Sequence, residues 1–74
     1  EAERSMEAER LWQAIDDVLS VRERTVVKLR YGIPCGRCMA QREVAAILGI
    51  SRSYVSRLEK KALTKLYSRL GEKL

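Results

Sequence analysis

Residues 41–60, QREVAAILGISRSYVSRLEK, decide the fold. Their apolar side chains recur every three or four positions on either side of a glycine, which is the pattern of two short helices joined by a tight turn. Gly49 has no Cβ and adopts the left-handed turn conformation at little cost. Ile50 is expected to fill the core beneath the turn, and Ser51 to cap the second helix. The stretch predicts a helix-turn-helix.

The two predicted helices have to pack closely against each other. Ala45 is small at the position where they cross. The expected contacts between them are four apolar side chains, Val44, Leu48, Val55 and Leu58. An ordinary helical hairpin is the plain alternative, because a short motif is a hypothesis until its structural context is known. In helix-turn-helix proteins the second helix lies in the major groove of DNA, so we expect a DNA-binding domain.

Length and composition restrict the chain to one small domain. Its 74 residues include no His, no Phe and one Pro, and 46% of them are hydrophobic. With apolar residues at helical spacing, this predicts an all-α, four-helix domain with a C-terminal helix-turn-helix and without a winged element. The chain has no room for a conventional catalytic pocket and carries no nucleophile–base pair, metal cluster or phosphate loop. We therefore expect neither an enzyme nor a cofactor.

Charge is divided unevenly along the chain. Residues 1–19 carry two basic and six acidic side chains, whereas residues 20–74 carry thirteen basic and four acidic ones. Such a division suits a body that binds a polyanion while its N-terminal segment faces another protein or a linker. The same composition also arises when charge only keeps a small domain soluble.

The start of the chain differs from the rest. Residues 1–10 are charged and rich in Ala and Glu, so we expect a linker or the frayed start of a helix from a missing upstream domain, followed by the domain itself over residues 11–74. The chain begins at Glu1, which indicates a piece of a longer protein. No signal peptide or membrane span is recognisable, so the cytoplasm is the expected location and no membrane partner is expected.

Apolar spacing and capping residues place four helices. Ser20 is expected to cap the second helix, and Gly32 and Pro34 to stop it. The first helix is expected to turn a stripe that includes Trp12 toward the core or an interface. The expected helix ranges are about 11–19, 21–31, 40–48 and 52–70.

The start of the last helix carries the expected base-reading residues. Their polar side chains point away from the apolar stripe: Arg52, Ser53, Ser56 and Arg57. Arginine bonds guanine O6 and N7 through two N–H groups, and each good pair contributes roughly 1–3 kcal/mol of discrimination. Arg52 also opposes the positive end of the helix dipole, which favours a functional role over a structural one. A solvated arginine is the alternative.

Other basic residues are expected to position the domain on the phosphates: Arg22, Arg30, Arg42, Lys60 and Lys61. Tyr54 is placed to touch the DNA backbone or a thymine methyl group, or to lie at the rim of the core. Glu43 is expected to form an ion pair with a nearby basic side chain, or to accept from cytosine N4.

Cys35 and Cys38 form a Cys-x-x-Cys element in the connector that precedes the helix-turn-helix. Two thiols without a histidine do not complete a closed zinc site within one chain unless unusual carboxylate or inter-chain ligands join them. A redox role stays open, because Cys38 lies just before a helix N-terminus and beside Arg37. The plain interpretation is two incidental loop residues.

Three motifs together resemble region 4 of bacterial RNA polymerase sigma factors. Residues 19–24 (LSVRER) and 27–33 (VKLRYGI) resemble its first half, and residues 41–63 resemble its helix-turn-helix. Residues 49–60 look most similar to sporulation sigma factors. The resemblance covers about residues 11–70 and implies that the fourth helix reads the minus-35 promoter element while the domain docks on the flap of the polymerase β subunit.

The resemblance also assigns residues. It places Arg22, Arg30 and Lys61 on phosphate-contacting positions. It implies an apolar flap-docking surface on the first two helices that includes Trp12, Ile15 and Val26.

The chain departs from the family pattern in two places. Ala40 stands where many members have a capping Thr, so the third helix is expected to start less firmly or to be capped from Met39 or Cys38. Ser53 and Ser56 replace larger polar or charged residues, so the preferred bases stay open.

Three other functions remain as alternatives. A response-regulator DNA-binding domain shares the four-helix layout, although residues 29–33 (LRYGI) favour a sigma factor. A protein–protein module would use the same surface to bind an anti-sigma factor or an activator. Redox sensing through the two cysteines would be recognised by a thiol-dependent DNA affinity.

Overall fold

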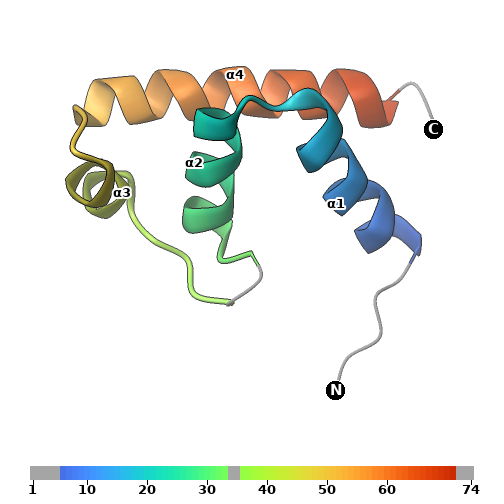
Figure 1. Cartoon of the computed structure of the whole chain (residues 1–74), viewed down its shortest axis with the longest axis horizontal. Coiled ribbons are helices and arrows are strands. Elements are labelled where there is room, and N and C mark those ends of the chain that lie inside the picture. Colours follow the sequence, from blue (N-terminus) through green and yellow to red (C-terminus); the bar gives the residue numbers. More distant parts are fainter. Residues whose placement is uncertain (1–5, 34–35, 72–74) are drawn as a thin grey trace.

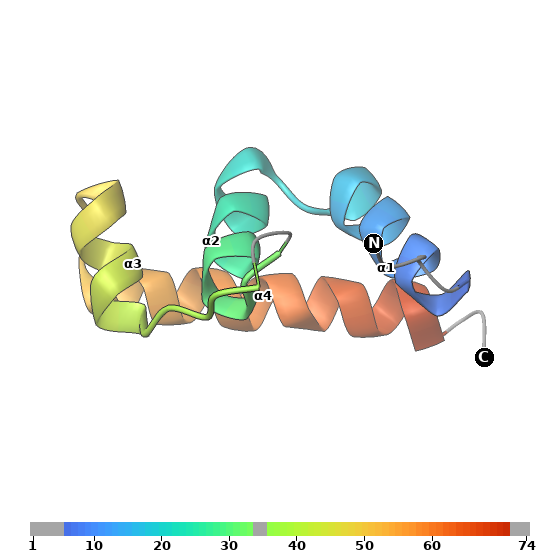
Figure 2. The same cartoon turned by 90° about the horizontal axis from the view of Figure 1, so that it is seen from below.

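The computed structural model describes residues 6–33 and 36–71, and within these ranges the chain forms four helices and no strand. The helices are α1 (Met6–Val18), α2 (Val21–Tyr31), α3 (Gln41–Leu48) and α4 (Arg52–Gly71). Figure 1 shows α4 as a long rod with the other three helices on one side of it. The view in Figure 2 places α3 at the N-terminal end of α4, α2 near its middle and α1 against its C-terminal half. The predicted all-α fold is confirmed.

Helix α4 contacts each of the other helices and divides the core into two clusters. One cluster joins α1, the middle of α2 and the C-terminal half of α4; its buried members are Ala14, Ile15, Leu19, Val27, Ala62 and Leu66. The other joins α2, α3 and the N-terminal half of α4; its buried members are Val26, Val44, Ala45, Val55 and Leu58. Ile50 and Leu48 pack against this second cluster, as the helix-turn-helix pattern predicts.

The predicted helix ends agree closely with the observed ones, apart from the first. Helix α1 begins at Met6 rather than at residue 11, so part of the expected linker is helical. Residues 1–5, for which a linker or frayed helix was expected, lie outside the described residues. Helix α2 begins with a full capping box, because Ser20 Oγ accepts from the Glu23 N–H at 3.2 Å and the Glu23 carboxylate accepts from the Ser20 N–H at 2.9 Å.

Gly32 ends α2 in the left-handed conformation, with φ at +67°. Its N–H donates to the carbonyl of Lys28, the bond that closes the last turn. A Cβ at this position would lie 2.6 Å from the backbone nitrogen of Arg37, so glycine is required by both conformation and space. The second predicted stop, Pro34, lies outside the described residues.

Candidate nucleic-acid interface

The turn between α3 and α4 has the geometry that the sequence predicts. Gly49 is left-handed, with φ at +68°, and its N–H donates to the Ala45 carbonyl at 2.9 Å. The Ile50 N–H donates to the same carbonyl at 3.1 Å. Ser51 Oγ then accepts from the Tyr54 N–H at 3.1 Å, which caps α4. These bonds fix the angle at which α4 leaves the turn.

The four expected base-reading side chains share one exposed surface of α4. Val55 is fully buried and Leu58 nearly so, which orients this half of the helix. Helical spacing places the polar residues on the side of α4 away from Val55 and Leu58. They form two adjoining rows, and Lys60 and Lys61 continue these rows one turn further along the helix. All six are exposed: Arg52, Ser53, Ser56, Arg57, Lys60 and Lys61. A continuous polar and basic surface thus covers the first three turns of α4.

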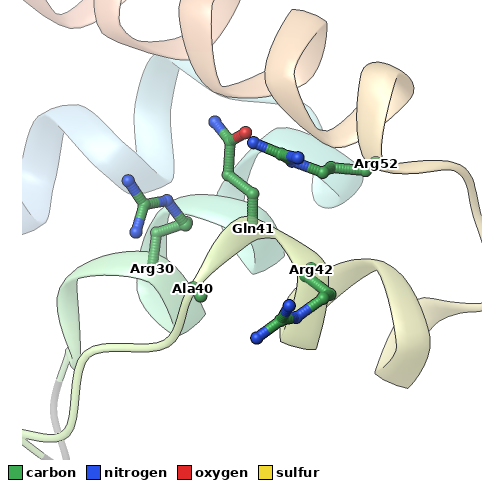
Figure 3. A pocket seen from close by; sticks show the side chains of 5 residues that line it. All are labelled: Arg30, Ala40, Gln41, Arg42 and Arg52. Carbon is green, nitrogen blue, oxygen red and sulfur yellow. The ribbon is translucent and has the colours of Figure 1, made fainter.

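A pocket of about 410 Å³ lies beside this surface, where the end of α2 meets the starts of α3 and α4. Its lining residues are Arg30, Ala40, Gln41, Arg42 and Arg52. Figure 3 shows the side chains of Gln41 and Arg52 directed toward each other, whereas Arg42 points away from them along the outside of α3. Three guanidinium groups around one hollow create a positive potential that suits a phosphate.

A buried carboxylate holds the helices around this pocket together. The Glu59 side chain is only 8% exposed and accepts a hydrogen bond from Arg30 Nε at 2.9 Å. It also accepts from the Tyr31 hydroxyl at 2.7 Å and from Gln41 Nε2 at 2.9 Å. Burial by itself would raise the pKa of Glu59, but the bonds from Arg30, Tyr31 and Gln41 outweigh it, so the pKa of Glu59 lies below its ordinary value of 4.5. Glu59 therefore ties α2 and α3 to α4 as a carboxylate.

Arg30 has a structural role in addition to the expected phosphate contact. Its Nε is committed to Glu59, and its Nη1 donates to the Met39 carbonyl at 2.8 Å. The hydrogen bond with Glu59 raises the pKa of Arg30 above its ordinary value. Arginine has five N–H donors, so three remain for the pocket. Of the other expected phosphate contacts, Arg22 and Arg42 are exposed.

Helix α3 starts without a side-chain cap. Ala40 occupies the cap position and offers no acceptor, which agrees with the first of the two expected alternatives, a less firm start, and not with a cap from Met39 or Cys38. Glu43 Oε1 accepts from the Ala40 N–H at 2.9 Å, which supplies the reciprocal half of a capping box. The ion pair expected for Glu43 is absent from the part of the chain that the structure describes.

Tyr54 lies between two of the expected DNA contacts. Its ring centroid is 5.7 Å from Cζ of Arg22 on α2 and 5.7 Å from Cζ of Arg57 on α4. The residue is 36% exposed. The sequence does not indicate these two arginine contacts.

The expected polymerase-docking surface needs correction. Ile15 and Val26 are both fully buried, one in each core cluster, and neither offers surface to a partner. Amphipathic spacing identifies a buried stripe without separating the core from a docking surface, which explains the error. Trp12 is half-buried, with Lys28 Nζ 5.5 Å from its ring.

An apolar groove of about 190 Å³ instead lies between α1 and the C-terminal half of α4. It is lined by Leu11, Leu63, Leu66, Tyr67 and Leu70. Tyr67 is 78% exposed, so this groove presents apolar surface to solvent.

The cysteine motif lies only partly within the described residues. Cys38 is exposed and free, whereas Cys35 lies outside the described residues. Across residues 6–33 and 36–71, no three His, Cys, Asp or Glu side chains gather in a way that would hold a metal ion. Of the described helices, none is both long and apolar enough to cross a membrane.

Three features of the site escaped the sequence interpretation: the Glu59 contacts, the arginines at Tyr54 and the apolar groove. Glu59 left a readable signal, because it lies four residues after Val55 and three before Ala62 on the buried side of α4. A carboxylate there requires a cationic or hydrogen-bonding partner from a neighbouring helix. The other two features depend on how α1 and α2 pack on α4, which helical periodicity alone does not determine.

Comparison with known proteins agrees with this geometry. Residues 17–68 match the family described as Sigma-70, region 4. The chain is 49% identical over 63 residues to the RNA polymerase sigma-28 factor of Bacillus thuringiensis subsp. kurstaki, a match covering 85% of this chain and 26% of that protein. It is equally identical over 63 residues to the sigma-K factor of Bacillus subtilis, at 49%, covering 85% of this chain and 21% of that protein.

The RNA polymerase sigma-E factor of Clostridium acetobutylicum is 45% identical over 56 residues, covering 76% of this chain and 24% of that protein. The chain thus spans about a quarter of the length of these relatives. The match to the family covers all of α2 and α3, the turn, and most of α4. The chain belongs to the Sigma-70, region 4 family: it is a DNA-binding helix-turn-helix domain of a sigma factor and not an enzyme.

Proposed function

We propose that this domain recognises promoters by placing the N-terminal half of α4 in the major groove of the minus-35 element. The observation that carries the proposal is the row of exposed Arg52, Ser53, Ser56 and Arg57 on α4, opposite the buried Val55. An α-helix fits the major groove of B-DNA, and its outward side chains then face the base edges. The two arginines are the residues with the geometry for guanine, and the serines accept more than one base.

The surrounding cations would position α4 on the DNA. Arg42 and Arg30 line the pocket beside α4. Arg22 contacts the ring of Tyr54, which places it near the start of α4. Lys60 and Lys61 extend the basic surface along α4. Phosphate contacts of this kind fix register and orientation without reading sequence. Binding to chromosomal promoters would place the domain in the cytoplasm.

We further propose that the domain docks on the β-flap of RNA polymerase through the groove between α1 and α4. The groove is apolar and open, its rim residue Tyr67 is mostly exposed, and it lies on the opposite half of α4 from Arg52 and Arg57. DNA and polymerase could thus be bound together without overlap. The likeness to sigma-K and sigma-E factors supports a sigma factor of the sporulation type.

Selection from a randomised duplex library tests the promoter proposal. The chain is mixed with a β-flap fragment, since a second contact raises the effective affinity of a weak DNA-binding module. The parent is expected to enrich one hexamer-like site, and Arg52→Ala to relax one or two positions of it. A pool that stays random while the flap still binds would overturn base reading and favour a module for an anti-sigma factor or an activator.

Binding of the flap fragment without DNA tests the docking proposal. Tyr67→Asp is expected to weaken flap binding about tenfold, because a charge then enters the apolar groove. Ser68→Asp adds the same charge at the neighbouring exposed position of α4 and serves as the matched control. Equal loss in both variants would point to net charge rather than to the groove, and no loss in either would refute this docking surface.

A further inference from the structure

We infer that Tyr54 is a positioning residue that aligns a phosphate-contacting arginine and a base-reading arginine for the same DNA site. The inference rests on the proposed promoter recognition. It starts from the two arginine contacts of this ring, at 5.7 Å from Arg22 and 5.7 Å from Arg57. These lie within the range of about 6 Å at which a guanidinium is attracted to an aromatic face.

The two arginines come from different helices. Arg57 lies three residues after Tyr54, so both occupy neighbouring positions on the exposed side of α4. Arg22 is the second residue of α2, a helix that runs across α4. The ring therefore couples the start of α2 to the second turn of α4, and it sets the separation between the two guanidinium groups.

Among the described residues, neither arginine has an ion-pair partner that would fix it. Arg22 also lies in the first turn of α2, where a cation opposes the helix dipole and adds nothing to the stability of that helix. The ring is thus the group that restricts these two long side chains before DNA arrives.

Tyr54 is itself held firmly enough to act in this way. Its N–H donates to Ser51 Oγ at 3.1 Å, which anchors the residue in the first turn of α4. The residue is 36% exposed, and the neighbouring Val55 is fully buried. A long arginine loses much rotamer entropy when it binds, so restricting it in advance raises affinity. One ring would do this for a phosphate contact and a base contact together.

The test compares Tyr54→Leu, which removes the aromatic face, with Tyr54→Phe, which keeps it. Affinity is measured by fluorescence anisotropy on the duplex selected by the parent. One exposed cation–π contact corresponds to about a two- to fivefold change in Kd, so Tyr54→Leu is expected to weaken binding by roughly five- to twentyfold. Tyr54→Phe is expected to remain within about twofold of the parent.

Double-mutant cycles separate positioning from packing. In an Arg57→Ala background, Tyr54→Leu is expected to have a smaller effect of about two- to fivefold, because only the Arg22 contact is left to lose. The discrimination at the base pair that Arg57 reads should fall with Tyr54→Leu, while the thermal midpoint of unfolding stays close to that of the parent. The slope of log Kd against log salt should fall by up to about 0.9 if the Arg22 phosphate contact weakens as well.

Each other outcome would overturn the inference. Equal losses with Phe and Leu would mean that the hydroxyl contacts DNA directly. A lower thermal midpoint with unchanged base discrimination would mean that Tyr54 only fills the rim of the core. A selected site that Tyr54→Leu leaves intact would refute the alignment but preserve promoter recognition, whereas the lack of any selected site would refute both.

Discussion

Replacing Glu59 by Gln should markedly lower the stability of this domain. The change keeps the size of the side chain and exchanges one oxygen for an NH2 group. Glu59 Oε1 accepts from Arg30 and Gln41, and Oε2 accepts from Tyr31. The glutamine amide reproduces part of this pattern, since the tyrosine hydroxyl can rotate and accept. What disappears is the negative charge beside the guanidinium of Arg30, whose side chain is 26% exposed.

The expected loss follows from burial. Breaking a fully buried ion pair costs about 3–5 kcal/mol, and hydrogen bonds to charged groups are worth about 1.5–3 kcal/mol each. Part of this is recovered here, because Arg30 keeps some solvent contact and its bond to the Met39 carbonyl. We expect Glu59→Gln to lower the free energy of unfolding by about 2–3 kcal/mol. That is a large share of the roughly 4–11 kcal/mol typical of a domain this size.

Urea unfolding followed by far-ultraviolet circular dichroism at pH 7 measures this loss. Asp17→Asn is the matched control, because it removes the charge from a surface pair, Asp17 with Arg69 at 2.9 Å, whose side chains are 44% and 32% exposed. Solvent screens such a pair, so the control should lose only about 0.5 kcal/mol or less. Equal losses in the two variants, with unchanged m-values, would refute the view that Glu59 holds the three helices together.

Three further predictions concern the same framework. Gly49→Ala should lower the free energy of unfolding by about 1–2 kcal/mol, because φ is +68° there, whereas Gly71→Ala at the end of α4 should be neutral or stabilising; equal effects in urea titrations would contradict this. Ala40→Ser should raise the free energy of unfolding by about 0.5–1 kcal/mol by adding the missing cap of α3, and an unchanged thermal midpoint would contradict it. Glu23 and Glu59 both have pKa values below 4.5 in the folded chain: burial opposes the shift, but the hydrogen bonds from Lys65 and from Arg30 respectively outweigh it. Their contribution is therefore complete above pH 4.5 and is lost as pH falls through the lowered values, so urea midpoints should drop as the pH falls below 4.5, and less so in Glu59→Gln.

Local sequence signals predict most of the fold of this chain. Helix caps such as Ser20 and Ser51 and the left-handed glycines act within a few residues of their own position, so the sequence shows them directly. Apolar spacing likewise identifies the members of the second core cluster that lie in the helix-turn-helix. Both depend on interactions that are short in sequence.

Contacts between distant segments were harder to foresee. Glu59 meets Tyr31 across 28 residues and Arg30 across 29, and Lys65 Nζ meets Glu23 at 2.8 Å across 42. Ile15 and Val26 lie on the apolar stripes of their helices, and only the packing of these helices on α4 shows that they are enclosed. The same packing creates the apolar groove and brings Arg22 to Tyr54. The apolar pattern of one helix does not specify which neighbouring helix covers its apolar side.

A double-mutant cycle across the interface tests most directly whether α4 reads bases. It combines a substitution in the protein with the replacement of a base pair in the DNA. Kd is measured by anisotropy, with the β-flap fragment present, for the parent, Arg52→Ala and Arg52→Lys on the selected duplex and on duplexes with single base pairs replaced. Lysine keeps the charge but loses the two-pronged geometry of arginine. We expect the parent to discriminate against one replaced base pair by roughly 1–3 kcal/mol and both variants to lose this discrimination at that position alone. Protein and base changes that simply add at every position would contradict it.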